Sequence, residues 1–158
     1  HRCRNALEGH LSELMIRALE SRDVEAIRAI QSACPEIAQW TVWDYDRVAR
    51  GEMAGWVAEQ NDLVIGFLVA RRVAGDLEIL NFAVTADVRR RGIGAQLLRE
   101  ALDWAQALQA THAILEVRAS NLAALRFYER HKFEVVGRRT RYYTAPIEDA
   151  LLLTATLG

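Results

Sequence analysis

The pattern of apolar positions predicts a short strand at about 15–19 and two short helices behind it. The first helix follows Ser21, a suitable N-cap, and ends at Cys34-Pro35, because the residue before a proline is disfavoured in the helical region. The second helix occupies about 44–50 and is closed by Gly51. Apolar residues at helical spacing mark the buried face of the first helix: Val24, Ile27 and Ile30.

Beyond residue 54 the pattern becomes that of strands, at about 56–59, 63–71 and 77–84. Asn61-Asp62 and Gly75-Asp76 supply the turns between them. A long helix is then expected over 92–110, with an apolar face formed by Ile93, Leu97, Leu98, Leu102, Ala105 and Leu108. A helix of this length is a suitable crossover, so the next strand should lie parallel to its predecessor.

The last third of the chain predicts that strand at 113–117, a helix capped by Asn121 and running to about 130, and closing strands at 133–136 and 151–157. The order of elements indicates a mixed α/β (α+β) fold. We expect a central, mostly antiparallel mixed sheet of about six or seven strands, flanked by about four helices.

Composition fits one globular domain, with 158 residues, 51% of them apolar and 26% charged. The net charge of -1 gives no overall attraction to nucleic acid or to an anionic membrane, so any anion site must be local. No apolar run approaches a membrane span, and no signal pattern opens the chain. The two cysteines have no metal-like spacing and are too few for a disulfide framework, which favours a reducing, cytoplasmic setting.

Residues 1–14 are interpreted as an N-terminal extension, and residues 15–158 as a single domain. The four histidines are His1, His10, His112 and His131. Two of them fall in the extension and two flank predicted elements, and their spacing suits no metal. We interpret all four as surface residues and expect no metal site.

The loop from Arg89 to Gly94 carries the first chemical signal. It lies between a strand and a long helix, where unpaired N–H groups and the positive end of the helix dipole bind phosphate. Gly92 and Gly94 allow a close backbone approach, and Arg89, Arg90 and Arg91 add positive charge. A pyrophosphate is the natural ligand. The alternative is a solvated basic turn, and the chain matches neither a P-loop nor a dinucleotide fingerprint.

Glu116 is the second anomaly, because a carboxylate inside the apolar strand 113–117 is costly to bury alone. Either it faces a wet cleft or a partner such as Arg118 pairs with it on the polar side of the strand. Tyr128 lies twelve residues further on, in the helix capped by Asn121, where a tyrosine is usually a core or interface residue.

These segments together resemble the Gcn5-related N-acetyltransferase (GNAT) superfamily. Arg89-Arg-Arg-Gly-Ile-Gly94 is similar to its Arg/Gln-x-x-Gly-x-Gly/Ala acetyl-CoA signature. Leu115-Glu-Val-Arg-Ala-Ser-Asn121 and Phe127-Tyr128-Glu129 resemble the ribosomal protein alanine N-acetyltransferase (RimI) subfamily, over roughly residues 15–157. The resemblance implies an acyl-CoA N-acyltransferase fold and an enzyme that transfers acetyl from acetyl-CoA to a primary amine.

The resemblance also implies roles for individual residues. Glu116 would be the general base, and Tyr128 the general acid that protonates the departing sulfur. The residues expected to bind acetyl-CoA are Phe82, Ala83, Val84, Arg89, Arg90, Arg91, Gly92, Ile93, Gly94, Ala95 and Asn121. The expected acceptor is the N-terminal Ala of a ribosomal protein, with neither nucleic acid nor membrane as a partner.

Acid–base chemistry makes an α-amine acceptor reasonable. Deprotonating an α-amine at neutral pH costs about 1 kcal/mol, whereas a lysine amine costs about 4–5 kcal/mol, so one carboxylate is better matched to the α-amine. Two alternatives remain: an enzyme of the same fold that acts on a small amine such as a polyamine, amino acid or aminoglycoside, and a non-catalytic acyl-CoA sensor.

Two features qualify the resemblance. Lys132-Phe133 stands where the subfamily usually has Gly-Phe, so a left-handed backbone at Lys132 would add about 1 kcal/mol of strain. The aromatic residues Trp40, Trp43 and Tyr45 either line a peptide groove or belong to the core.

Overall fold

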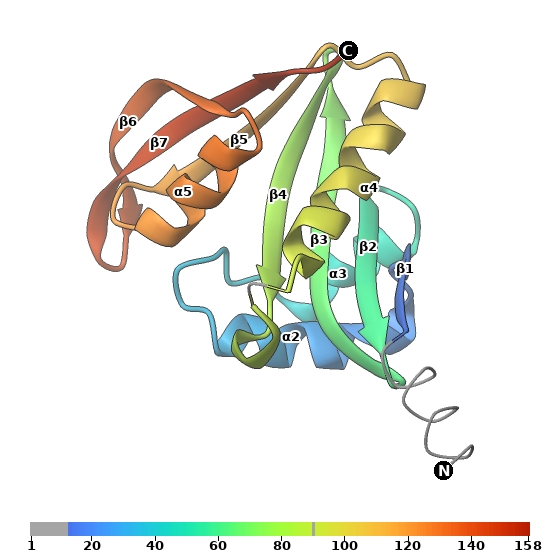
Figure 1. Cartoon of the computed structure of the whole chain (residues 1–158). Helices are drawn as coiled ribbons and strands as arrows, with labels where there is room; N and C mark the ends of the chain where they lie inside the picture. The colour runs from blue at the N-terminus through green and yellow to red at the C-terminus, as the bar shows by residue number, and fades with distance from the viewer. Residues whose placement is uncertain (1–12, 90) are drawn as a thin grey trace. The chain divides into compact units, whose positions relative to one another are not determined.

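The computed structural model describes residues 13–89 and 91–158, which form a seven-stranded sheet with four α-helices and two short 3₁₀ helices (Figure 1). In chain order the elements are β1 (Leu14–Ala18), η1 (Ser21–Asp23), α2 (Val24–Ser32), α3 (Val42–Ala49), β2 (Ala54–Gln60), β3 (Leu63–Val73), β4 (Asp76–Val84), η2 (Ala86–Val88), α4 (Ile93–Ala107), β5 (His112–Arg118), α5 (Leu122–Arg130), β6 (Glu134–Thr144) and β7 (Ile147–Thr156). The strands are hydrogen-bonded in the order β1-β2-β3-β4-β5-β7-β6.

The sheet is mixed, as predicted. β1 pairs with β2, β5 with β7 and β6 with β7 in antiparallel fashion, while β4 and β5 are parallel. The parallel ladder joins Leu77–Glu78 to Ala113–Ile114. The parallel direction predicted from the crossover helix α4 is therefore confirmed.

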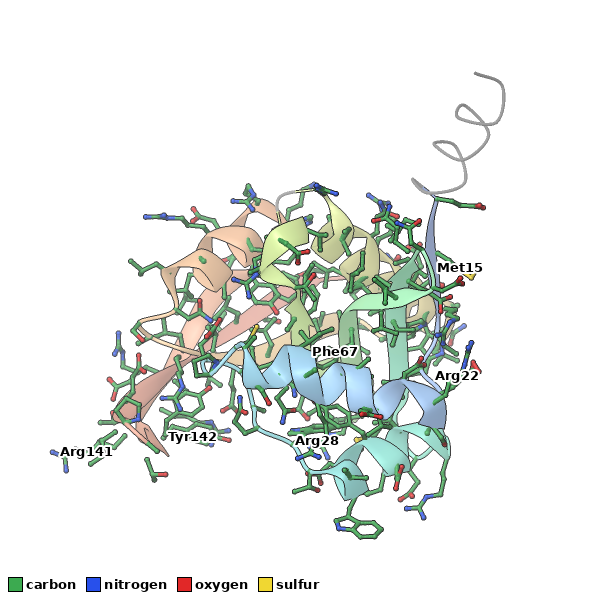
Figure 2. All side chains as sticks on the ribbon, turned by 90° about the horizontal axis from the view of Figure 1, so that it is seen from below. Met15, Arg22, Arg28, Phe67, Arg141 and Tyr142 are labelled. Atoms are coloured by element: carbon green, nitrogen blue, oxygen red, sulfur yellow. The ribbon has the colours of Figure 1, made fainter. Side chains whose placement is uncertain are left out.

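The described residues fall into two compact units, the first comprising 13–69, 81–89 and 91–101, and the second 70–80 and 102–158. Phe67, labelled in Figure 2, is fully buried in the core of the first unit. Its ring meets that of the buried Tyr45 edge to face, with centroids 5.9 Å apart. Leu97 of α4 packs closely on β3, because a Cβ at Gly66 would come within 3.1 Å of its Cδ1 atom.

The entry to the first helix differs from the prediction, because Ser21 is not its N-cap. Glu20 and Asp23 form a capping box instead, in which Asp23 Oδ2 accepts from the Glu20 N–H at 2.8 Å. Both oxygens of Asp23 are also bound by Arg17, at 2.8 Å each. A carboxylate held by a guanidinium is a stronger acceptor than a serine hydroxyl, so the pair Glu20–Asp23 determines where the helix begins.

The second unit contains the largest departure from the predicted strands. β6 and β7 form a long hairpin of 11 and 10 residues, whereas the sequence indicated strands at 133–136 and 151–157. Most of β6 is exposed at the edge of the sheet and is rich in arginine and tyrosine, so it lacks the apolar alternation that identifies a strand. Its register against β7 shifts twice, the second time between Arg139 and Tyr143.

The turns follow local backbone requirements. Asn61 and Asp62 have φ of 56° and 63°, which confirms the predicted hairpin turn, while the next turn is made by Ala74 and Gly75, at φ 50° and 86°. Asp76, predicted in that turn, instead opens β4. Lys132 has φ 68°, so the residue in place of the subfamily glycine does adopt the left-handed conformation.

Several expectations fall on residues outside the described ranges. Arg90 is one of them, as are His1, His10 and most of the segment 1–14 interpreted as an extension. His112 is exposed and His131 is half-buried.

Candidate active site

The loop between β4 and α4 has the backbone expected of an anion site. Gly92 has φ 80°, and a Cβ placed there would meet no atom within 4 Å, so the loop presents an open surface. The Gln96 N–H donates to the Gly92 carbonyl at 3.1 Å, which makes Gly92 the residue at the start of α4. The amides of Ile93, Gly94 and Ala95 are therefore first-turn N–H groups, which have no partner within a helix.

The side chains of this loop differ in burial and in what they contact. Ile93 is buried, so its contribution to an anion site is its backbone N–H. Arg91 is exposed beside Gly92. Arg89 turns back to the protein: its Nε donates to the Val84 carbonyl at 3.1 Å, and its Nη2 donates to Cys34 Sγ at 3.0 Å.

The strand segment Phe82–Val84 lies beyond the part of β4 that is paired with β5. Ala83 is buried, while Phe82 and Val84 are half-buried. Next to this segment, Thr85 Oγ1 is a buried hydroxyl that has no hydrogen-bond partner among the described residues. A buried unpaired hydroxyl beside a half-buried strand end fits a segment that receives a polar ligand.

Asn81, which sequence reasoning missed, connects β4 to the segment between α2 and α3. Its Nδ2 donates to the Ala38 carbonyl and to the Tyr45 hydroxyl, both at 3.0 Å. The Tyr45 hydroxyl donates to Gln31 Oε1 at 2.5 Å, and Gln31 Nε2 donates to the Trp40 carbonyl at 2.8 Å. An asparagine on the same face of the strand as Leu77, Ile79 and Ala83 was the available signal, since a buried amide needs partners.

The three aromatic residues near this network have separate roles. Tyr45 is fully buried, while Trp40 is half-buried with its ring 5.3 Å from that of Tyr45. Trp43 is 77% exposed on α3. The core interpretation is therefore correct for Tyr45 and wrong for Trp43.

In the second unit, Glu116 projects from β5 and is half-buried. Its Oε1 lies 3.4 Å from Arg139 Nε, and its buried Oε2 has no hydrogen-bond partner within 13–89 and 91–158. The suggested pairing with Arg118 is wrong. Arg118 Nη1 pairs with Glu148 Oε1 at 3.3 Å, and its guanidinium lies 4.2 Å over the ring of Tyr143.

Two tyrosines of β6, which sequence reasoning did not assign to the site, are electrostatically coupled to Glu116. The charge of Glu116 is the main cause of the raised pKa of Tyr142, and burial followed by the same charge raises the pKa of Tyr143. Arg141 has φ 52° and its side chain extends away from the hairpin, while Tyr142 lies on the other side of the ribbon (Figure 2). Tyr142 lies in the stretch of β6 where the register against β7 shifts, between Arg139 and Tyr143.

Tyr128 and Asn121 are held by α5. Tyr128 is 7% exposed, with its ring 5.3 Å from that of Phe133, and burial raises its pKa well above the ordinary value. Its hydroxyl therefore keeps its proton at neutral pH. Asn121 caps the helix as predicted, since its Oδ1 accepts from the Ala124 N–H at 3.2 Å.

Neither a metal site nor a membrane-spanning helix is found in the part of the chain that the structure describes. No group of three or more His, Cys, Asp or Glu in that part could hold a metal ion. None of its helices has the length and apolar character that crossing a membrane requires.

Comparison with known proteins places these features in a family. Residues 16–133 match the model of the acetyltransferase (GNAT) family. The chain is 37% identical over 100 residues to the [ribosomal protein bS18]-alanine N-acetyltransferase of Salmonella typhimurium, which covers 62% of this chain and 68% of the relative.

Solved structures share the fold. The ribosomal-protein-S18-alanine N-acetyltransferase from Escherichia coli superposes with a TM-score of 0.82 at 27% identity, covering 92% of this chain and 95% of that one. Arabidopsis thaliana NAA60 in complex with acetyl-CoA superposes with a TM-score of 0.81 at 22% identity, covering 91% and 98%.

The fold, the glycine-containing loop ahead of α4 and the family match together define an acetyltransferase, and the chain belongs to the GNAT family. It is an acetyl-CoA-dependent N-acetyltransferase, so acetyl-CoA is one substrate and an amine is the other.

Proposed function

We propose that this enzyme acetylates the N-terminal α-amine of a ribosomal protein that begins with Ala, with Glu116 as the general base. The observation that carries the proposal is the half-buried carboxylate of Glu116, whose Oε2 has no hydrogen-bond partner among the described residues. Support for the acceptor comes from the relatives named as alanine N-acetyltransferases of a ribosomal protein. A ribosomal acceptor also suits the cytoplasmic setting favoured by the cysteine content.

The proposed cofactor residues provide donors for the two polar parts of acetyl-CoA. First-turn amides of Ile93, Gly94 and Ala95 would hold the pyrophosphate, at an open loop where Gly92 needs its positive φ, with charge from Arg91 and Arg90. Backbone groups of Phe82–Val84 would hold the pantetheine arm. Asn121 would contact the cofactor through its amide nitrogen, because its Oδ1 already caps α5.

Glu116 would accept the proton that the amine loses. Acetyl-CoA supplies the acetyl group as a thioester, and no acyl-enzyme is needed if the amine attacks directly. The α-amine has a pKa of about 7.7–8.0, so a single carboxylate suffices to take its proton at neutral pH, directly or through a water.

Tyr128 would donate its hydroxyl proton to the departing sulfur. Burial raises its pKa, which keeps the hydroxyl protonated at every pH at which the enzyme works. Solvent then returns a proton to the phenolate, while Glu116 releases to solvent the proton that it took from the amine. A tyrosine in this state is a donor throughout the working range, as the role requires.

The test is the release of free CoA thiol from acetyl-CoA with a matched panel of acceptors. The panel holds an Ala-starting ribosomal N-terminal peptide, the same peptide with a blocked N-terminus and one lysine, and several small amines. Turnover with the free Ala peptide alone would support the proposal. Turnover only with small amines would mean that the acceptor is a small amine and not a ribosomal protein. CoA binding without turnover on any amine would favour a sensor.

A further inference from the structure

Arg89 opens the basic loop, yet its guanidinium donates hydrogen bonds to the protein itself. The Nε atom donates to the Val84 carbonyl at the end of β4, at 3.1 Å. The Nη2 atom donates to Cys34 Sγ, at 3.0 Å, just after α2. One guanidinium therefore joins the end of the strand expected to bind the pantetheine arm to the segment between α2 and α3.

Both acceptors are themselves held in place. Cys34 is 2% exposed, its N–H donates to the Gln31 carbonyl at 3.0 Å, and its carbonyl accepts from Gln39 Nε2 at 3.2 Å. Burial raises the pKa of the Cys34 thiol, so Sγ is a neutral acceptor. Beyond Val84, the Thr85 N–H donates to the Ile65 carbonyl at 2.9 Å, which fixes the end of β4 to β3.

The segment joined to Arg89 is attached to β4 a second time. Asn81 Nδ2 donates to the Ala38 carbonyl at 3.0 Å, and Gln31 Nε2 holds the Trp40 carbonyl at 2.8 Å. Residues 34–40 are therefore attached to β4 at two points, through Arg89 at Cys34 and through Asn81 at Ala38.

We infer that Arg89 is a positioning residue, which keeps its bonds to Val84 and Cys34 when acetyl-CoA is bound, and that it is not a ligand of the pyrophosphate. A planar guanidinium presents N–H groups in fixed directions, and here two of them are directed at the protein. Turning Arg89 toward a phosphate would leave the buried Cys34 Sγ and the Val84 carbonyl without this donor. The phosphate charge is then met by Arg91 and the first-turn amides of α4.

The first test needs no change at Arg89. In a Cys3→Ser background Cys34 is the remaining thiol, and its rate of reaction with an aromatic disulfide reagent is measured with and without saturating CoA. Burial raises the pKa of the Cys34 thiol and Arg89 lowers it, so the departure of Arg89 would change both the thiolate fraction and the access to Sγ. If Arg89 stays on Cys34, CoA leaves the rate unchanged within about twofold. A change of about threefold or more in either direction on CoA binding would mean that Arg89 leaves Cys34, and would overturn the inference.

The second test separates charge from geometry with Arg89→Gln, Arg89→Lys and, as a matched contrast in the same loop, Arg91→Gln. For Arg89→Gln we expect kcat to fall about tenfold, while the Kd for CoA and its salt dependence stay within about twofold of the parent. Arg89→Lys should not restore kcat, because an ammonium cannot bridge the two acceptors. Arg91→Gln should instead weaken CoA binding and flatten its salt dependence.

The opposite pattern would assign Arg89 to the phosphate: a Kd for CoA raised about tenfold in Arg89→Gln, a flatter salt dependence, and recovery in Arg89→Lys. Thiol reactivity and CoA binding are measured without an acceptor amine. A failure of this inference is therefore distinguishable from a failure of the proposed ribosomal acceptor.

Discussion

The Nε atom of Arg139 lies 3.4 Å from Oε1 of Glu116, so the carboxylate proposed as the base already has a cationic partner. Arg139 is 55% exposed, and its guanidinium lies 5.6 Å from the ring centroid of Tyr142. An acceptor ammonium group that approaches Glu116 has to compete with this guanidinium. Arg139 therefore influences how tightly a charged amine binds.

Arg139→Gln should lower the KM for the acceptor peptide by about two- to fourfold, because an exposed ion pair of this kind is worth roughly 0.2–1 kcal/mol. The effect should be larger for a diamine than for a peptide with a single amine. Steady-state kinetics at low ionic strength measure it. The control is Arg138→Gln, since Arg138 pairs with Asp149 and not with Glu116; equal effects of the two substitutions would contradict the prediction.

Glu116→Gln should reduce turnover by about 10²–10⁴-fold where the amine is protonated, and by less as the pH rises. At higher pH more of the amine is already neutral, so the missing base matters less. Thiol release across about pH 6 to 9 gives the profile. Activity equal to that of the parent over this range would rule out Glu116 as the base.

Tyr128→Phe should slow turnover by about 10²-fold, and by the same factor at every pH. Because burial raises the pKa of Tyr128, the parent hydroxyl does not titrate in this range, and the ratio of the two rates should be flat. The same thiol assay measures the ratio. A ratio that varies with pH would point to another proton donor.

Asp23→Asn should destabilise the fold by about 3 kcal/mol, because it removes one side of a nearly buried ion pair with Arg17. Burial opposes ionisation of Asp23, but the bonds from Arg17 and from the Glu20 amide outweigh it, and the pKa is lowered. Its stabilising contribution is thus present above the unfolded value of 3.8 and is lost as the pH falls toward the lowered folded pKa. Urea unfolding of parent and variant at several pH values tests both statements, and a parallel acid response in the two proteins would refute the second.

Lys132→Gly should stabilise the protein by up to about 1 kcal/mol, because Lys132 has φ 68° and glycine reaches this conformation without a Cβ penalty. Lys132→Ala separates the two effects, since it removes the long side chain but keeps the Cβ. We expect no gain from the alanine variant in thermal or urea unfolding. A gain of the same size in both variants would assign the effect to the side chain instead of the backbone.

Local signals in the sequence identified those parts of the fold whose physics is local. Asn121 caps α5 and Asn61-Asp62 form a hairpin turn because each depends on only a few neighbouring residues. Gly92 precedes α4 for the same reason. These are the features that propensity and capping rules describe well.

Contacts between distant residues were not predictable in the same way. The partner of Glu116 is Arg139 on a strand two positions away in the sheet, while the sequence offered the neighbouring Arg118. Ser21 lost its capping role to Asp23 because Arg17 reaches across from β1. The hydrogen-bond partners of Asn81 are Ala38 and Tyr45, which lie 43 and 36 residues earlier in the chain.

The register shift between Arg139 and Tyr143 has a consequence for how the acceptor preference of this enzyme could change over time. Asp149 holds the irregular stretch on both sides, accepting from Arg138 Nη1 at 2.6 Å and from the Arg141 N–H at 2.9 Å. The pairing of β6 with β7 resumes at Tyr143, which lies opposite Glu148. The pairs before the irregular stretch and the pairs after it therefore do not depend on the residues within it. Insertions or exchanges at 140–142 would therefore alter the side chains near Glu116 while the hairpin itself retains its pairing, which makes this short stretch a favourable place for a new specificity to arise.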